Sequence, residues 1–335
     1  MHNMKILLIS NYQKGIGGIN TQVDLLHTYL TQESGIFVDI FSTKGNLLRR
    51  IRKLFQLLFL VRYYDVLHIH ACSYFGMIPV VMGVIAGKLW SRRVIITYHG
   101  GRAAEYLAKH NKFAKRWLQR ADQVVVLSNF LKEIFDHYVI PSIVIPNIIV
   151  LQPLQPRLYT TNPRFISIRH LEPLYDISCI LQAYKEILVD YPNATLDIIG
   201  QGSMRQELEK YVEENQLTGI QFVGQVSNQQ IYEYLYNTDI MLSAAKIDNM
   251  PVSLLEAMNA GVLIIASKVG GIPYMIEDGK TGVLFSSGNV QQLYDKIRWA
   301  LEHTNEVQTI RYNAQMSVQQ YAWKEIKEKL LKIYE

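Results

Sequence analysis

The residues best suited to chemistry lie in one segment of the second half of the chain. It reads Asp248-Asn-Met-Pro-Val-Ser-Leu-Leu-Glu256 and is followed five residues later by Gly261. Pro251 suits the first turn of a helix and Gly261 suits its end, so the pattern predicts a helix over residues 252–260. Asp248 then precedes the helix, and Glu256 lies on it.

The start of this helix would offer free N–H groups and the positive end of the helix dipole to a phosphate. Asp248 could accept hydrogen bonds from sugar hydroxyls, and Glu256 could bind a ribose in the same way. The alternative is that Asp248 only caps the helix and that Glu256 lies on a solvated face. The spacing alone leaves both interpretations open.

A second candidate phosphate site is the glycine cluster Gly15-Ile-Gly-Gly18, between a short apolar strand and a helical pattern. Glycines there would let the backbone approach a phosphate closely. The spacing is not G-x-G-x-x-G, because Asn20 stands where the last glycine would be. Asp39 also lies inside the next strand and not at its end. Both features disfavour a dinucleotide site, and an ordinary tight turn is the alternative.

Strand and helix patterns alternate along the chain, which favours parallel sheets with helices on both faces. Strands are predicted at residues 5–10, 37–41, 66–70, 94–99, 124–128, 165–169, 195–200, 221–223, 240–243 and 263–267. A proline-punctuated stretch at 151–163 divides the two series. We therefore predict α/β domains at residues 1–153 and 163–315, with helix from residue 299 onward. Because ligands bind at the carboxyl ends of such strands, we expect the site in a cleft between the domains.

The composition limits the class of protein. The chain has 335 residues, 49% of them hydrophobic and 19% charged, which is typical of a folded globular protein. Two cysteines, Cys72 and Cys179, form neither a disulfide framework nor a four-ligand zinc site. They favour core thiols in a reducing compartment, so we expect a cytoplasmic location. The apolar run at 76–87 is too short for a spanning helix and predicts a buried one.

The charge is unevenly distributed: residues 1–150 hold 18 Lys and Arg against 8 Asp and Glu, and the remainder holds 16 against 21. Residues 47–61 predict a basic amphipathic helix, and 109–120 mix basic and aromatic residues. The apolar stripe of the first is Leu47, Ile51, Leu54, Phe55 and Leu58. The candidate membrane or acceptor residues are Arg49, Arg52, Lys53, Phe59, Lys112, Phe113, Lys115, Arg116 and Trp117. Basic and aromatic residues mixed in this way suit the surface of an anionic membrane. The alternative is two solvated helices packed on a sheet. A nucleic-acid partner is disfavoured because no recognition motif accompanies the charge.

Residues 243–282 resemble the retaining glycosyltransferases of family 4, which have the GT-B fold. The resemblance lies in the 248–261 segment, in Val269-Gly-Gly-Ile-Pro273 and in Asp278-Gly-Lys-Thr-Gly282. Further pieces occur in the family's order, namely Asp65-Val-Leu-His-Ile-His70, Thr97-Tyr-His-Gly100, Pro146-Asn147, Ile198-Ile-Gly-Gln-Gly202 and Phe222-Val-Gly224.

The resemblance implies two Rossmann-like domains facing a cleft, with a final helix at 316–335 returning to the first domain. It also implies transfer of a hexose or N-acetylhexosamine from a UDP- or GDP-sugar to a glycan or lipid-linked acceptor, in cell-surface polysaccharide or glycolipid synthesis. Such an enzyme would work in the cytoplasm, as a peripheral protein on the inner face of the plasma membrane.

The family's roles carry over to matching residues. Glu256 matches the glutamate that binds the donor ribose, and Asp248 takes the place of an acid that contacts the transferred sugar. His99 matches the histidine that ends a strand of the first domain, near the reactive centre of the sugar. Gly17 and Gly18 would face the diphosphate. Other implied donor contacts are Gly200, Asn249, Met250, Pro251, Val252 and Ser253.

One departure concerns the diphosphate site, where the family has an Arg and, five residues later, a Lys. Here Arg169 or His170 could be the Arg, but the Lys position falls on Tyr175. A lost charge-assisted contact costs about 1.5–3 kcal/mol. The sequence has no Asp-x-Asp, so we expect no metal and no cofactor. The resemblance implies retention of configuration, and because no residue is a strong candidate for a covalent nucleophile, we expect same-face attack within an ion pair. The alternatives are a sugar-nucleotide epimerase, a degenerate non-catalytic subunit and a nicotinamide-dependent enzyme.

Overall fold

The structure is a computed structural model that describes residues 3–15, 17–153 and 162–335. The chain divides into two compact units, Met1–Ile148 with Tyr321–Glu335, and Ile149–Gln320. Two sequence features lie partly outside the described residues, namely position 16 in the glycine cluster and positions 154–161 in the proline-punctuated stretch.

The first unit contains a six-stranded sheet. Its strands are β1 (Met4–Ser10), β2 (Ile36–Ser42), β3 (Val66–Ala71), β4 (Arg93–Tyr98), β5 (Gln123–Val126) and β6 (Ile143–Val144). They lie in the order β2-β1-β3-β4-β5-β6, and every neighbouring pair is parallel. The strand order reverses between β1 and β3, which is where open α/β sheets bind their ligands.

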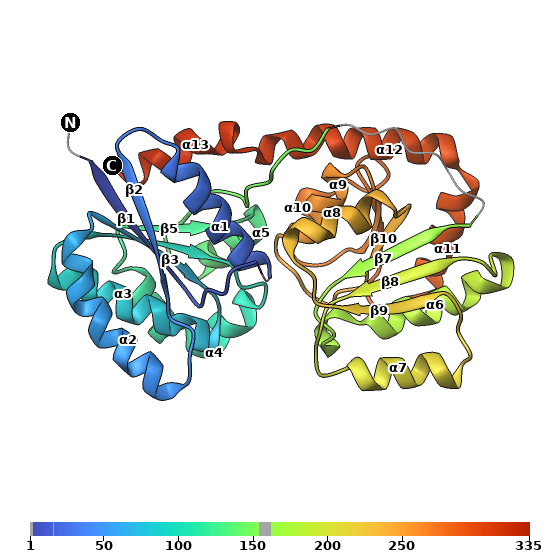
Figure 1. Cartoon of the computed structure of the whole chain (residues 1–335), viewed down its shortest axis with the longest axis horizontal. Helices are drawn as coiled ribbons and strands as arrows, with labels where there is room; N and C mark the ends of the chain where they lie inside the picture. Colours follow the sequence, from blue (N-terminus) through green and yellow to red (C-terminus); the bar gives the residue numbers. More distant parts are fainter. Residues whose placement is uncertain (1–2, 16, 154–161) are drawn as a thin grey trace. The chain divides into compact units, whose positions relative to one another are not determined.

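Helices cover both faces of this sheet (Figure 1). They are α1 (Gly18–Thr31), α2 (Leu47–Leu60), α3 (Ile78–Leu89), α4 (Ala103–Leu118), α5 (Asn129–His137) and α13 (Trp323–Lys332). Because strand side chains alternate between faces, Ile6 and Leu8 of β1 pack with α1 and α13, whereas Leu7 and Ile9 pack with the layer of α2 to α5. The end of the chain is therefore part of the first unit's core.

The second unit repeats this architecture. Its strands are β7 (Arg164–Ile168), β8 (Thr195–Ile199), β9 (Ile220–Gly224), β10 (Ile240–Ser243), β11 (Leu263–Ser267) and β12 (Val283–Phe285). The order is β12-β11-β10-β7-β8-β9, again with parallel neighbours. Its helices are α6 (Ile177–Asp190), α7 (Arg205–Glu214), α8 (Asn228–Tyr236), α9 (Val252–Asn259), α10 (Ile272–Met275), α11 (Val290–Glu302) and α12 (Thr304–Ser317). The strand order reverses between β7 and β10.

The predicted fold class of two doubly wound α/β domains is confirmed, and three local differences have physical reasons. The strands β6 and β12 were not predicted, because segments of two and three residues show no periodicity. The predicted helix from residue 299 onward is three helices, α11, α12 and α13. His303 leaves helical geometry with φ −115° and ψ 60°, and Ala322 with φ −69° and ψ 151°.

The apolar run at 76–87 forms most of α3, whose Pro79 stands in the first turn and whose Val80 and Val84 are buried. Within the described residues no helix has the length and apolar character that crossing a membrane requires. Both cysteines are free thiols, with Cys179 buried and Cys72 half-buried.

Candidate functional site

In the second unit, a buried cation lies where the strand order reverses. Arg169 directly follows β7, and Ser243 ends the neighbouring strand β10. The parallel register brings the two residues to the same edge of the sheet, at the carboxyl ends of its central strands. A site for an anionic ligand is expected at this position in a doubly wound sheet.

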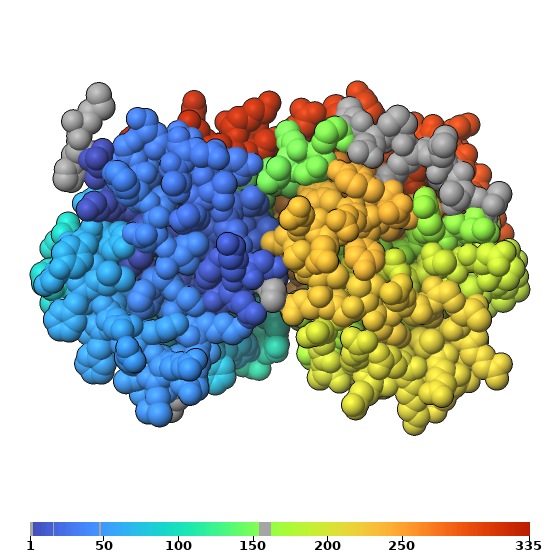
Figure 2. All heavy atoms as spheres, in the orientation of Figure 1, coloured from blue at the N-terminus to red at the C-terminus, as the bar shows by residue number. Residues whose placement is uncertain are grey.

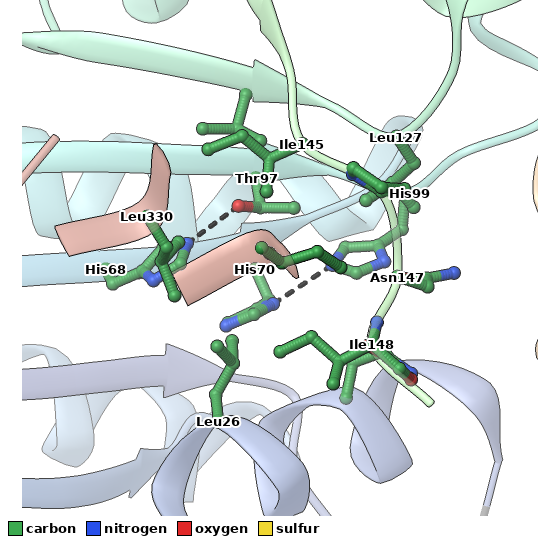
Figure 3. Close-up of a pocket in the computed structure, with 14 residues that line it drawn as sticks. Leu26, His68, His70, Thr97, His99, Leu127, Ile145, Asn147, Ile148 and Leu330 are labelled. Carbon is green, nitrogen blue, oxygen red and sulfur yellow. Dashed lines mark hydrogen bonds between the residues drawn. The ribbon is translucent and has the colours of Figure 1, made fainter. Parts of the chain in front are cut away.

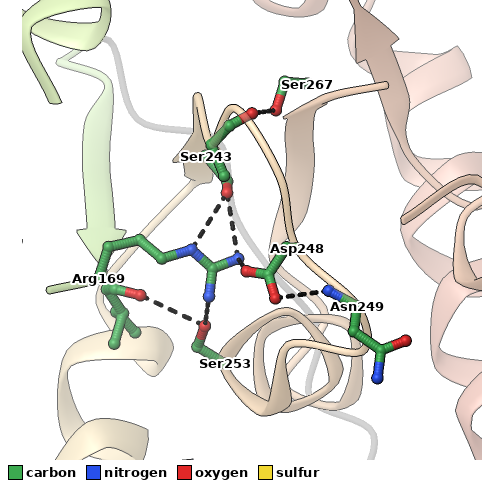
Figure 4. Close-up of polar contacts among 8 residues, drawn as sticks. Arg169, Ser243, Asp248, Asn249, Ser253 and Ser267 are labelled. Carbon is green, nitrogen blue, oxygen red and sulfur yellow. Dashed lines mark hydrogen bonds and ion pairs between the residues drawn. The ribbon is translucent and has the colours of Figure 1, made fainter. Parts of the chain in front are cut away.

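The Arg169 guanidinium is held from three directions (Figure 4). Nη1 donates to Ser253 Oγ at 2.9 Å, and Nη2 donates to Ser243 Oγ at 3.1 Å. Nη2 also lies 3.4 Å from Asp248 Oδ2. Only 7% of the Arg169 side chain is exposed, so its charge depends on Asp248 for compensation. Partners on three separate segments fix the guanidinium in one orientation.

The loop before α9 presents Asp248 to this cation. Asp248 Oδ1 also accepts from the backbone N–H of Asn249 at 2.8 Å, within the loop itself. The N-cap of α9 is Pro251, and no side chain caps the helix, so the interpretation of Asp248 as a cap is wrong. A Cβ on Gly270 would lie 1.8 Å from Asp248 O, so the glycine at this position leaves room for the loop before α9.

Glu256 lies on α9 and is 6% exposed, so the interpretation of this residue as a solvated surface acid is wrong. Desolvation by burial raises the pKa of its carboxyl to about 8. A carboxyl group kept neutral or poised near neutrality can both donate and accept hydrogen bonds. Hydroxyl pairs of a ribose have the matching combination of donors and acceptors.

The Tyr175 ring lies beside the cation, with its centroid 5.9 Å from Arg169 Cζ. Burial and then the Asp248 carboxylate raise the pKa of the Tyr175 phenol, so it stays neutral. His170 is exposed and its Nδ1 lies 3.4 Å from Gln201 O, so Arg169 is the cation of this cluster. A Cβ on Gly200 would lie 1.8 Å from Arg169 O, so this glycine allows β8 to approach the Arg169 backbone.

The glycine loop of the first unit leads into α1 at the end of β1. Gly17 is the N-cap of α1 with φ 85°, in the left-handed region that favours glycine, and Gly18 is the first helical residue. Asp24 braces the loop by accepting from the Tyr12 hydroxyl and, at 3.4 Å, from Gly15 N. A Cβ on Gly17 would meet nothing within 4 Å, so the described part of the loop leaves its backbone open to a ligand.

His99 directly follows β4 and takes part in a cluster of three histidines (Figure 3). His99 Nε2 lies 3.0 Å from Nδ1 of His70, and the His70 ring stacks on His68 with centroids 4.6 Å apart. His68 binds Thr97 Oγ1 at 2.7 Å and the Tyr334 hydroxyl at 2.8 Å. A small cavity of about 20 Å³ lies against the cluster.

Burial lowers the pKa of all three histidines, to about 3 for His68, to about 4 for His99 and well below the ordinary value for His70. The rings are therefore neutral near pH 7. The first unit thus places a neutral hydrogen-bonding cluster at the carboxyl ends of β3 and β4.

The structure brings together Arg169, Asp248, Tyr175 and Ser253 in one unit, and it places Gly17, Gly18 and His99 in the other. Sequence reasoning missed Ser243, His68 and His70. The two histidines belong to a motif that carried the family resemblance, and their alternation along a strand indicates one shared face. Ser243 ends a predicted strand, but no local pattern marks a serine as an arginine acceptor.

The predicted amphipathic helix is α2, and its apolar residues are divided between the core and the surface. Ile51 and Phe55 are exposed, whereas Leu57 is fully buried and Leu54 and Leu58 pack on the core beside it. The core takes a narrow stripe centred on Leu57, so it leaves the remaining apolar residues outside. Arg49, Arg52 and Phe59 are exposed, as are Lys112, Phe113 and Arg116 on α4. Lys53 and Lys115 are half-buried, and Trp117 packs partly on the core.

Two family models match the chain. A model described as Glycosyltransferase Family 4 matches residues 16–152, and one described as Glycosyl transferases group 1 matches residues 152–317. Sulfoquinovosyl transferase SQD2 of Arabidopsis thaliana is 28% identical over 43% of this chain and 28% of its own length. Alpha-monoglucosyldiacylglycerol synthase of Acholeplasma laidlawii is 26% identical over 51% of this chain and 44% of its own. The chain therefore spans less than half the length of these two relatives.

Among solved structures, Anabaena HepE in complex with UDP and glucose matches with a TM-score of 0.80 and 19% identity, over 98% of both chains. This likeness shows that the two units have the GT-B arrangement of secondary structure.

Proposed function

This chain belongs to the glycosyltransferases of family 4 and group 1, and we propose that it transfers a hexose or N-acetylhexosamine from a UDP- or GDP-sugar to a lipid-linked or glycan acceptor, with retention and without a metal. The observation that carries the proposal is the buried Arg169 held by Asp248, Ser243 and Ser253 at the switch point of the second sheet. A fixed cation at this position suits a diphosphate, and HepE binds UDP on the same fold.

On the donor side, Glu256 binds the ribose hydroxyls and Asp248 binds hydroxyls of the transferred sugar. Arg169 stabilises the diphosphate as it leaves, because its charge is preorganised and shielded from water. Tyr175, in the place of the family's lysine, can donate a hydrogen bond but adds no charge. The start of α9 supplies further N–H donors, and the family resemblance assigns the Gly17–Gly18 backbone to the diphosphate as well.

In the reaction, the bond between the anomeric carbon and the diphosphate oxygen breaks, and a bond from that carbon to the acceptor oxygen forms on the same face. The proton of the acceptor hydroxyl passes to the departing diphosphate. We assign His99 a role near the reacting sugar, as the family resemblance implies. No described side chain is assigned as a covalent nucleophile.

We place the acceptor at a membrane because α2 exposes a mixed face. Leu48, Ile51, Arg52, Phe55 and Phe59 recur at helical spacing, and the four apolar members are 46–78% exposed. Figure 2 shows α2 within the blue surface of the first unit. Exposed apolar residues interleaved with basic ones suit an anionic interface, and one relative is named for a glycolipid product.

The membrane proposal is tested by co-sedimentation with phosphatidylglycerol and phosphatidylcholine vesicles. We expect binding to the anionic vesicles, and Arg52→Glu should weaken it about fivefold or more, since each basic residue contributes about 1 kcal/mol. Lys185→Glu, on α6 of the second unit, is the matched charge control and should leave binding unchanged. Equal sedimentation of Arg52→Glu and the unaltered protein would contradict the membrane face.

Transfer itself is tested with ¹⁴C-labelled UDP-glucose, UDP-N-acetylglucosamine and GDP-mannose, in EDTA, with vesicles that contain diacylglycerol or with an oligosaccharide mixture. We expect label in the acceptor fraction with one of the donors. Conversion of the donor sugar without an acceptor would instead support the epimerase alternative. Donor binding without any turnover would support a degenerate subunit.

A further inference from the structure

The His70–His99 contact has a direction that the surroundings of His70 determine. His70 is 4% exposed in β3, and its Nδ1 lies 3.0 Å from His99 Nε2 (Figure 3). Two neutral imidazoles can share this hydrogen bond in only two ways. Either His70 Nδ1–H donates to His99 Nε2, or His99 Nε2–H donates to His70 Nδ1.

The opposite nitrogen of His70 distinguishes these two arrangements. His70 Nε2 is buried, and among the described residues no hydrogen-bonding group contacts it. The neighbouring cavity wall is largely apolar and includes Leu26, Ile148 and Leu330. If His99 were the donor, neutral His70 would carry its proton on this nitrogen, as a buried N–H without an acceptor. Orphaned buried N–H groups are rarer than under-satisfied acceptors, so the arrangement with His70 as donor is favoured.

A protonated His70 does not offer a third arrangement. It would place a charge in an apolar setting with one N–H unpaired, and burial lowers the pKa of this ring well below the ordinary value. The neighbouring rings, His68 and His99, are neutral as well, so neither offers a negative charge that would stabilise a protonated His70. His70 therefore carries a single proton, which lies on Nδ1 and is donated in the hydrogen bond to His99 Nε2.

We propose that His70 is a positioning residue that fixes His99 in the tautomer with the proton on Nδ1. His99 Nε2 is occupied as an acceptor, and within the described residues Nδ1 makes no hydrogen bond. His99 then presents an N–H donor, and not a basic nitrogen, to whatever oxygen approaches it. Together with the proposed function, on which this last step rests, the oxygen belongs to the sugar or to the acceptor, and His99 does not remove the acceptor's proton.

Long-range ¹H–¹⁵N NMR of protein labelled with ¹⁵N-histidine reads the tautomer directly, without any activity. Spectra of His99→Gln and His70→Gln assign the two rings. We expect the Nδ1–H form for His99 in the unaltered protein, and a shift towards Nε2–H in His70→Leu. His70→Asn, whose amide can donate towards His99, should restore the Nδ1–H form.

Tyr334→Phe is the matched control, because it removes a partner of His68 and leaves the His70–His99 bond in place. It should not change the His99 signals. In a transfer assay, His70→Leu should lower kcat about tenfold with little change in the donor KM, as expected for one hydrogen bond that forms in the transition state. His70→Asn should recover most of the loss.

A His99 ring protonated on Nε2 in the unaltered protein would overturn the inference, and so would an Nδ1–H form that persists in His70→Leu. Either result would contradict the tautomer assignment without contradicting the proposed donor binding and sugar transfer. Conversely, an Nδ1–H form in a protein that transfers no sugar would support the tautomer assignment while the proposed function fails.

Discussion

The two units carry candidate sites at the same place in the same kind of sheet, but the site of the second unit contains charged groups and that of the first unit contains neutral ones. In the second unit, Asp248 lies 3.4 Å from the buried Arg169 guanidinium and compensates its charge. In the first unit, His70 is buried and His99 is half-buried, and among the described residues no carboxylate contacts either ring. Burial lowers the pKa of both, so they are neutral near pH 7. Strand topology therefore determines where each site lies, whereas the local partners determine its charge. A charged edge suits a diphosphate, and a neutral hydrogen-bonding edge suits sugar hydroxyls.

The largest effect is expected from Arg169→Met, which would leave Asp248 partly buried without its cation. Loss of one partner of a buried pair costs about 3–5 kcal/mol of unfolding free energy, and nucleotide binding should also disappear. Urea unfolding and a UDP thermal shift measure the two effects. Arg164→Met breaks another pair in the same unit, with Asp239, away from the site. This control should lose stability but keep its nucleotide response; loss of the response in both variants would contradict a specific role for Arg169.

Acid should destabilise the neutral cluster. The folded-state pKa values of about 3 for His68 and about 4 for His99 lie below the ordinary 6.5, so the unfolded chain takes up these protons first. Their contribution to stability is complete above pH 6.5 and is lost as the pH falls towards 4. Each histidine adds a slope of up to about 1.4 kcal/mol per pH unit.

Urea unfolding of the unaltered protein and of His68→Phe between pH 7 and 4.5 isolates the contribution of His68 to the unfolding free energy, because the carboxylates titrate alike in the two proteins. The variant should show the shallower slope. Parallel slopes would mean that His68 takes up its proton at the same pH in the folded protein as in the unfolded chain, and the electrostatic contrast between the units would fail.

Glu256, in the second unit, should make the unfolding free energy depend on pH with the opposite sign. Its pKa is raised to about 8 from 4.5, so the folded protein holds this proton more tightly than the unfolded chain. The contribution is complete below pH 4.5 and is lost as the pH rises through 8, at up to about 1.4 kcal/mol per pH unit. Glu256→Gln should remove this slope between pH 6 and 8.5 in urea unfolding. An unchanged slope would place the carboxyl in contact with water.

The smallest effect is expected from Tyr175→Lys, which adds the cation that the family has at this position. Nucleoside diphosphate binding should tighten roughly three- to tenfold, as one charge-assisted contact shared with Asp248 would give. Calorimetric titration measures this change, with Tyr175→Phe as the control for loss of the hydroxyl. Weaker binding by the lysine variant would show that the site accepts no second cation.

Much of this architecture was predictable from the sequence, because strands such as β1 and β11 are continuous apolar runs and prolines mark the boundary between the two series. Asp248 and Glu256 were found through their spacing around a helix start. What the sequence left open depends on tertiary contacts. Burial turns Glu256 from a surface acid into one with a raised pKa, and Ser243 reaches Arg169 from 74 residues along the chain.

The histidine cluster shows the same limit. His68 and His70 are visible in the sequence as an alternating pair on one strand. Their roles became clear only when His99, 29 residues after His70, was found within hydrogen-bonding distance. The outer face of α2 was open for a related reason, since a helical stripe does not reveal how much of it the core will cover.

In the proposed function, the charged cluster of the second unit binds the nucleoside diphosphate part of a sugar donor. This binding is tested most directly by a thermal-shift panel with UDP, GDP, ADP and NAD, each in EDTA and in Mg²⁺. A ligand at 100 times its dissociation constant stabilises by about 2.7 kcal/mol. We predict a shift with UDP or GDP that is equal in EDTA and Mg²⁺. No shift with either nucleotide, or a shift with NAD alone, would contradict a nucleoside diphosphate site in the second unit.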